Sequence, residues 1–175
     1  MKSALIVIDM QRGLFASPKH DAGGLVTRLN DLGGRVRAAG GIVVFVQHEG
    51  RAGDAFEPQS LGWQLLPDLV VEANDILVRK ESCDAFLDTG LADVLRLHSV
   101  DRLIITGCAT DYCVDTTVRS ALARSYSTIV PADGHTVSDR PHLSAEKIIA
   151  HHNAIWADFI APAGPALISR CADIS

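Results

Sequence analysis

Positive charge, long apolar runs and aromatic residues are all scarce in this chain of 175 residues. The formal net charge is −5, so the chain lacks the basic footprint on which nucleic-acid and anionic-membrane binding depend. No apolar run approaches the ~20 residues of a membrane-spanning helix, and the N-terminus shows no secretory signal. We therefore expect neither a nucleic-acid nor a membrane partner.

Cysteine is also sparse: the chain has four cysteines, with no paired framework and no Cys-x-x-Cys motif. Free thiols in a reducing compartment are the simplest explanation, which predicts a cytoplasmic protein. Hydrophobic residues make up 47% of the chain and charged residues 21%, as in a globular protein with a sizeable core. Because only 5% of the residues are aromatic, a parallel sheet covered by Ala/Leu-rich helices is the natural core.

Short, continuously apolar segments alternate along the chain with segments of helical periodicity. This alternation predicts one three-layer α/β/α domain of the Rossmann-like kind over residues 1–175, with a mainly parallel sheet of about six strands. The strands are expected at Ser3–Ile8, Ile42–Val46, Asp75–Val78, Leu103–Ile105 and Tyr126–Val130, with a short edge strand within Phe159–Ile168. The helices are expected at Asp21–Ala39, from Asp88 or Thr89 to Leu97, from Tyr112 or Cys113 to about Ala123, and at Ser144–Trp156.

The segment from His48 to Asn74 has no clear periodicity and holds several glycines and prolines. A long irregular segment in a compact domain is usually functional or mobile, so we expect it to cover the site. Trp63 is either a wall of that site or an anchor of the segment to the core.

The stretch from Asp101 to Thr117 offers a candidate nucleophile. It begins as a buried strand, is expected to break at Gly107, and enters a helix near Tyr112 or Cys113. The first N–H groups of a helix are unpaired and its dipole is positive there, which favours a thiolate and suits an oxyanion. Cys108 and Cys113 are both candidates for the nucleophile, and the position of Cys113 near the start of the helix favours it. An equal alternative is that neither is a nucleophile and both are small buried core residues.

Two further polar residues follow predicted strands. Asp9 ends the first strand and Lys80 follows the third, and open α/β sheets bind ligands at the carboxyl ends of their strands. Taken alone, Asp9 is more often a turn residue and Lys80 a solvated one. Beside Cys113, however, Lys80 would lower the pKa of the thiol, and Asp9 would accept its proton and return it to a leaving group.

Three motifs in this chain are together similar to those of the isochorismatase-like cysteine hydrolase superfamily. They are Asp9-Met10-Gln11 with Phe15, Lys80 after an apolar strand, and the sequence GCATDYCV at residues 107–114. The resemblance runs from Ser3 to about Phe159, and the last motif is its most specific part. Relatives in this superfamily include nicotinamidases, carbamoylsarcosine amidohydrolases and isochorismatases.

The resemblance implies a catalytic triad of Asp9, Lys80 and Cys113, which decides between the two cysteines. It also implies a cis peptide bond between Cys108 and Ala109, and an oxyanion hole formed by the backbone N–H groups of Ala109 and Cys113. A small-molecule substrate and a homo-oligomer, either a dimer or a tetramer, follow from the same resemblance.

The chain departs from the nicotinamidases after its second strand. Those relatives carry an Asp-x-His metal motif there, whereas this chain has Gln47-His48-Glu49-Gly50. One histidine and one glutamate do not make that site, so we predict no metal, no other cofactor and no nicotinamidase activity. We expect His48 to line the substrate pocket instead, together with Phe15, Trp63 and Tyr112.

The activity predicted from these residues is metal-independent hydrolysis of a small amide or lactam by thiolate attack, through a thioester. Two alternatives stay open. One is vinyl-ether cleavage of an isochorismate-like compound, which would depend on Asp9 as a general acid more than on a thiolate. The other is an interaction or scaffold protein built on a catalytically inactive hydrolase fold.

Overall fold

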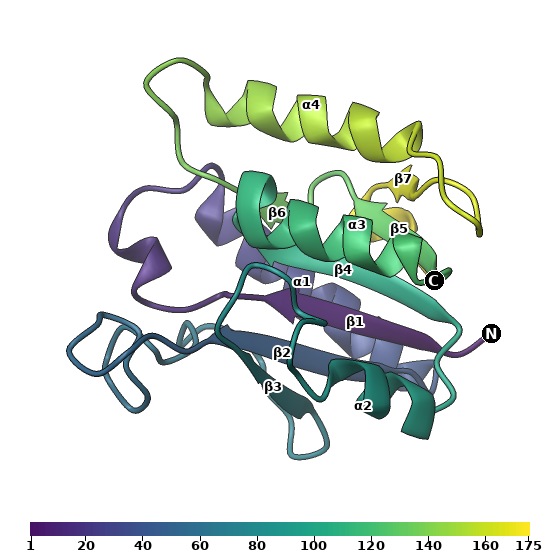
Figure 1. Ribbon diagram of the computed structural model, residues 1–175, viewed down its shortest axis with the longest axis horizontal. Coiled ribbons are helices and arrows are strands. Elements are labelled where there is room, and N and C mark those ends of the chain that lie inside the picture. The colour runs from purple at the N-terminus through teal and green to yellow at the C-terminus, as the bar shows by residue number, and fades with distance from the viewer.

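A single parallel sheet runs through the centre of the computed structural model, which describes all residues from Met1 to Ser175 (Figure 1). The sheet has seven strands. Six of them follow the order β3-β2-β1-β4-β5-β7, and the seventh, the short strand β6, pairs with the end of β4. The strands are β1 (Ser3–Ile8), β2 (Ile42–His48), β3 (Ile76–Lys80), β4 (Arg102–Cys108), β5 (Ser127–Pro131), β6 (His135–Thr136) and β7 (Leu167–Ser169).

Helices cover both faces of the sheet (Figure 1). Along β1 successive side chains alternate between the faces: Leu5 and Val7 pack with one apolar cluster, and Ile6 and Ile8 with the other. The first cluster is completed by α1 (Ala22–Ala38), and the second by α2 (Leu91–Leu97), α3 (Asp115–Ala123) and α4 (Ala145–Ala157). The three-layer α/β/α architecture predicted from the sequence is therefore confirmed. None of the helices combines the length and the apolar composition that crossing a bilayer requires.

Several boundaries differ from the predicted ones, mostly at the carboxyl edge of the sheet. The expectation that Gly107 breaks its strand is wrong, because β4 continues to Cys108 through the added pairing with β6. The strand β6 lies between the expected strand Tyr126–Val130 and the expected helix Ser144–Trp156, where no strand was predicted. A π-helical turn over Thr110–Val114, hereafter the π-turn, precedes α3, so Cys113 lies in this wider turn instead of the first turn of an α-helix.

The chain bends sharply where β1 ends. Asp9 has a φ of 49°, in the left-handed region that aspartate tolerates better than most residues, and its N–H donates to the carbonyl of Val46 on β2. On the neighbouring strand Gly107 has a φ of 118°, and a Cβ placed on it would lie 2.1 Å from the carbonyl oxygen of Ile8. Only glycine lets β4 approach the end of β1 this closely.

We expect Gly107→Ala to lower the free energy of unfolding by about 3 kcal/mol or more, since it adds both a clash and an unfavourable φ. Gly34→Ala is the matched control: Gly34 is an exposed residue of α1 with open space around it, and alanine should stabilise the helix by about 0.5–1 kcal/mol there. Urea unfolding of both variants measures these changes. Equal stabilities would contradict the close approach at Gly107.

Candidate active site

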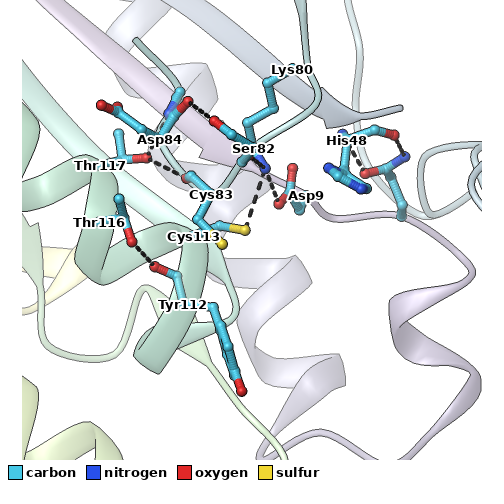
Figure 2. Close-up of polar contacts among 12 residues, drawn as sticks. Asp9, His48, Lys80, Ser82, Cys83, Asp84, Tyr112, Cys113, Thr116 and Thr117 are labelled. Carbon is cyan, nitrogen blue, oxygen red and sulfur yellow. Dashed lines mark hydrogen bonds and ion pairs between the residues drawn. The ribbon is translucent and has the colours of Figure 1, made fainter. Parts of the chain in front are cut away.

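The ammonium group of Lys80 lies at the centre of a buried polar cluster (Figure 2). Its Nζ atom donates to Oδ2 of Asp9 at 2.7 Å, to the carbonyl oxygen of Ser82 at 2.9 Å and to Sγ of Cys113 at 3.3 Å. Three N–H bonds thus have three acceptors, which fixes the side chain in place. The structure brings together the three residues that the sequence analysis singled out.

Each of these side chains comes from a different element. Asp9 follows β1, Lys80 is the last residue of β3, and Cys113 belongs to the π-turn after β4. Because β1, β3 and β4 are parallel strands of one sheet, their carboxyl ends lie at the same edge. Asp9 and Cys113 are 104 positions apart in the sequence, and the order of the strands in the sheet brings them together.

Burial and charge act in opposite directions on the ionised pair. Asp9 is 1% exposed, and loss of water raises the pKa of its carboxyl group against the attraction of Lys80. Burial also works against the ammonium of Lys80, yet the neighbouring Asp9 carboxylate and Cys113 sulfur leave its pKa raised above the ordinary value. Lys80 therefore stays a cation at neutral pH, whichever neighbour carries the negative charge.

The pKa of the Cys113 thiol is raised, not lowered as the sequence suggested. Burial has the largest effect, the Asp9 carboxylate adds to it, and the attraction of Lys80 only partly compensates. The resting state is consequently a thiol beside a carboxylate and an ammonium. Moving the proton from Cys113 to Asp9 leaves the total charge of the cluster unchanged, so the transfer requires no new buried charge.

The backbone between β4 and the π-turn is organised around Ala109. The peptide bond between Cys108 and Ala109 is cis, as the resemblance implied. The carbonyl of Ala109 accepts from the N–H groups of Tyr112 and Val114, which closes the π-turn, while the Ala109 N–H donates to no acceptor in the protein. Ala109 and Cys113 both line the same cavity.

That cavity has a volume of about 890 Å³. Asp9, His48, Ala109, Tyr112 and Cys113 line it, in agreement with the sequence analysis, and Lys80 lies buried behind Asp9 and Cys113. Sequence reasoning missed several lining residues that carry no motif of their own, among them Lys19, Phe56, Glu81, Cys83 and Arg140.

Two residues expected in the pocket lie outside it. Phe15 packs against the apolar cluster beneath α1, and its neighbour Leu14 lines the cavity instead. Trp63 is an anchor and not a wall: its carbonyl accepts from the side-chain amides of Gln11, at 2.8 Å, and Gln47, at 3.1 Å. These amides hold the long segment after β2 against the sheet, and the indole packs against the guanidinium of Arg79 at 5.4 Å instead of lining the cavity.

His48 belongs to the cavity wall through its ring, which meets the ring of Phe56 edge-on at a centroid distance of 5.7 Å. Its backbone is fixed by Gln11, whose side-chain amide donates to the His48 carbonyl and accepts from the His48 N–H. No three side chains of His, Cys, Asp or Glu gather anywhere in the protein in an arrangement that could hold a metal ion.

The fold and the site together define a class of three-layer α/β proteins with a cysteine beside a buried Asp–Lys pair at the carboxyl edge of a parallel sheet, and comparison with known proteins specifies the family. A family model described as the isochorismatase domain matches residues 3–157. A crystal structure of an isochorismatase family protein superimposes with a TM-score of 0.87 at 31% sequence identity, over 95% of this chain and 96% of the other. The chain belongs to the isochorismatase family.

Some of the relatives have named activities. A streptothricin hydrolase of Streptomyces noursei is 36% identical over 142 residues, which cover 79% of this chain and 56% of the relative. A ureidoacrylate amidohydrolase of Enterobacter sp. (strain 638) is 38% identical over 74 residues, which cover 41% of this chain and 32% of the relative. The chain thus spans little more than half the length of the streptothricin hydrolase that it matches.

Two buried thiols should make the protein less stable as the pH rises into the alkaline range. Burial raises the pKa of Cys108 and of Cys171 to about 12, whereas an unfolded thiol ionises near pH 8.5. Above that pH the unfolded chain loses these protons first, so the free energy of unfolding should fall by about 1.4 kcal/mol per pH unit for each thiol. The decline should extend from about pH 9 to pH 12.

Urea titrations between pH 8 and pH 12 measure this decline. Cys108→Ala removes one of the protons and should make the slope shallower, whatever its effect on stability at pH 8. A slope that the substitution leaves unchanged would show that Cys108 ionises equally well in the folded protein.

Proposed function

We propose that the protein is a metal-independent cysteine hydrolase that cleaves a carbon–nitrogen bond in small amides or lactams. The observation that carries this proposal is the single ammonium of Lys80, hydrogen-bonded at once to the Asp9 carboxylate and the Cys113 sulfur beside a cavity. Asp9, Lys80 and Cys113 then form a catalytic triad in which no histidine takes part.

In the first step the sulfur of Cys113 attacks the amide carbonyl carbon while Asp9 takes the thiol proton. The acceptor is Oδ1 of Asp9, a buried oxygen that has no hydrogen-bond partner in the protein, whereas Oδ2 is held by Lys80. A carbon–sulfur bond forms and the carbonyl oxygen becomes an oxyanion. The N–H groups of Ala109 and Cys113 stabilise that oxygen in the proposed oxyanion hole.

In the second step protonated Asp9 gives its proton to the substrate nitrogen, the carbon–nitrogen bond breaks, and an amine leaves a thioester on Cys113. Asp9, again a carboxylate, then takes a proton from water, whose oxygen attacks the thioester carbon. The acid is released and the proton returns to the sulfur. A lactam follows the same steps, except that its amine and acid stay in one product molecule.

Lys80 contributes constant positive charge throughout this cycle. The negative charge moves from Asp9 to the oxyanion and back, and the ammonium lies within hydrogen-bonding distance of both the carboxylate and the sulfur. Because its three N–H bonds are all used, Lys80 binds neither water nor substrate and serves as an electrostatic support.

The named relatives support carbon–nitrogen cleavage, since one is called an amidohydrolase and the other a hydrolase of streptothricin. The wall of the cavity supports a small substrate with an apolar part, because Leu14, Phe56 and Tyr112 border it together with His48. We propose that His48 and Tyr112 contact the substrate directly.

We expect Cys113→Ala to lower kcat/KM by about 10³-fold or more on any substrate found in a panel of amides and lactams, read by release of ammonia or amine. Cys83→Ala is the matched control, because Cys83 lines the same cavity without a bond to Lys80, and it should stay within a few-fold of the unmodified protein. Turnover by Cys113→Ala at the normal rate would refute thiol attack. Retained cleavage of a vinyl ether by that variant would support acid catalysis by Asp9 instead.

Asp9→Asn removes the proton acceptor but keeps the size of the side chain. We expect kcat/KM to fall by about 10³-fold, because no carboxylate is left to take the thiol proton or to return it to the leaving nitrogen. Glu81→Gln, which neutralises an exposed carboxylate on the same cavity, should change kcat/KM little. Equal kcat/KM values in the two variants would mean that Asp9 does not carry the proton.

A further inference from the structure

The π-turn that carries Cys113 is connected to α4 at both of its ends, at its start through His135 of β6 and at its end directly. At its start, Oγ1 of Thr110 is 2.9 Å from Nδ1 of His135, whose Nε2 lies 3.0 Å from Oδ1 of Asn153 on α4. At its end, Nε1 of Trp156, one turn further along α4, donates to Oδ1 of Asp115 at 2.8 Å. Two side chains of α4, Asn153 through His135 and Trp156 directly, thus bracket five residues of backbone.

The direction of each bond in the first chain can be worked out. The amide nitrogen of Asn153 donates to the carbonyl of Ala132, so its oxygen faces His135 and must accept a hydrogen bond. Nε2 of His135 therefore carries the proton, and the unprotonated Nδ1 accepts from the hydroxyl of Thr110. The imidazole is neutral and in one defined tautomer.

Packing keeps the ring in this state. Thr110 is completely buried and His135 is 3% exposed, and the ring of His135 meets the indole of Trp156 edge-on at 5.1 Å. Burial lowers the pKa of His135 to about 4, so the ring stays neutral at physiological pH. The strand β6, to which His135 belongs, also pairs with Gly107 and Cys108 and so ties the ring to the backbone before Ala109.

From this geometry we propose that His135 is a positioning residue: through Thr110 it fixes the orientation of the adjoining Ala109 N–H, which belongs to the proposed oxyanion hole. Asn153 acts one step further out by setting the tautomer of the ring. The inference rests on the proposed oxyanion hole and adds residues that touch neither the substrate nor the sulfur. It also gives Asn153, in the sequence His151-His152-Asn153, a role that the sequence did not disclose.

Two isosteric substitutions of His135 separate positioning from simple packing. His135→Asn puts an amide oxygen near the place of Nδ1 and can still accept from Thr110, whereas His135→Gln puts an amide nitrogen near the place of Nε2 and keeps only the bond to Asn153. Thr110→Val removes the hydroxyl with almost no change of shape, and Thr110→Ser restores it. A packing role would affect the two His135 variants alike and would spare Thr110→Val.

The measurement uses propionaldehyde as a probe that needs no knowledge of the natural substrate. The thiol of Cys113 adds across the aldehyde C=O: a carbon–sulfur bond forms, the thiol proton passes to the oxygen, and nothing leaves. That oxygen occupies the oxyanion hole, so the affinity of the probe reports on the hole. The dissociation constant is obtained from protection of Cys113 against iodoacetamide, and the alkylation rate without aldehyde reports on the thiol alone.

We expect His135→Gln and Thr110→Val each to weaken propionaldehyde binding by about tenfold, with alkylation rates within twofold of the unmodified protein. His135→Asn and Thr110→Ser should bind the probe within about threefold of it. The double variant His135→Gln/Thr110→Val should be no worse than either single one, because both break the same bond.

This design distinguishes a failure of the proposed hydrolase mechanism from a failure of the positioning role of His135. If the unmodified protein shows no aldehyde protection of Cys113, the proposed hydrolase mechanism fails. If protection is present and Thr110→Val binds the probe as tightly as Thr110→Ser does, the positioning role of His135 is refuted, and this comparison stands even if the His135 variants do not fold.

Discussion

The contact between the Lys80 ammonium and the Asp9 carboxylate is the constraint on which the site depends. Both groups are almost completely buried, and neither charge would be stable there without the other. The strand β2 lies between the two strands that supply them, so the contact spans the end of a neighbouring strand. A cysteine brought next to this pair enters a site whose charges already balance, and its proton can move without disturbing that balance.

The sequence predicted the parts of the fold that local pattern determines. The apolar runs of β1 and β4 mark buried parallel strands, and parallel strands place their carboxyl ends at one edge, so Asp9, Lys80 and Cys113 could be expected to meet. The sequence did not predict the net effect of that meeting on the thiol. Attraction by Lys80 is visible in a list of residues, whereas burial and repulsion by Asp9 depend on how deeply the cluster lies.

Features set by distant partners could not be predicted. The short strand β6 forms because His135 and Thr136 pair with the end of β4. Two residues are too few to show a strand pattern in the sequence. From the sequence Trp63 could be either a pocket wall or an anchor, and the glutamine side chains from elsewhere that hold its backbone carbonyl are not visible in its local sequence. Likewise, nothing local distinguishes Asn153 from a surface residue of an amphipathic helix.

The buried side-chain amide of Gln11 anchors a surface loop to the chain next to the end of β1. It holds both ends of the first part of the long segment after β2, with bonds to the backbone of His48 at its start and of Trp63 near its middle. Residues between these fixed points, Phe56 among them, can be exchanged, lengthened or shortened while Asp9, only two positions from Gln11, keeps its place. A change of length or sequence in that loop therefore alters one wall of the cavity and leaves the buried Asp9–Lys80 pair in place.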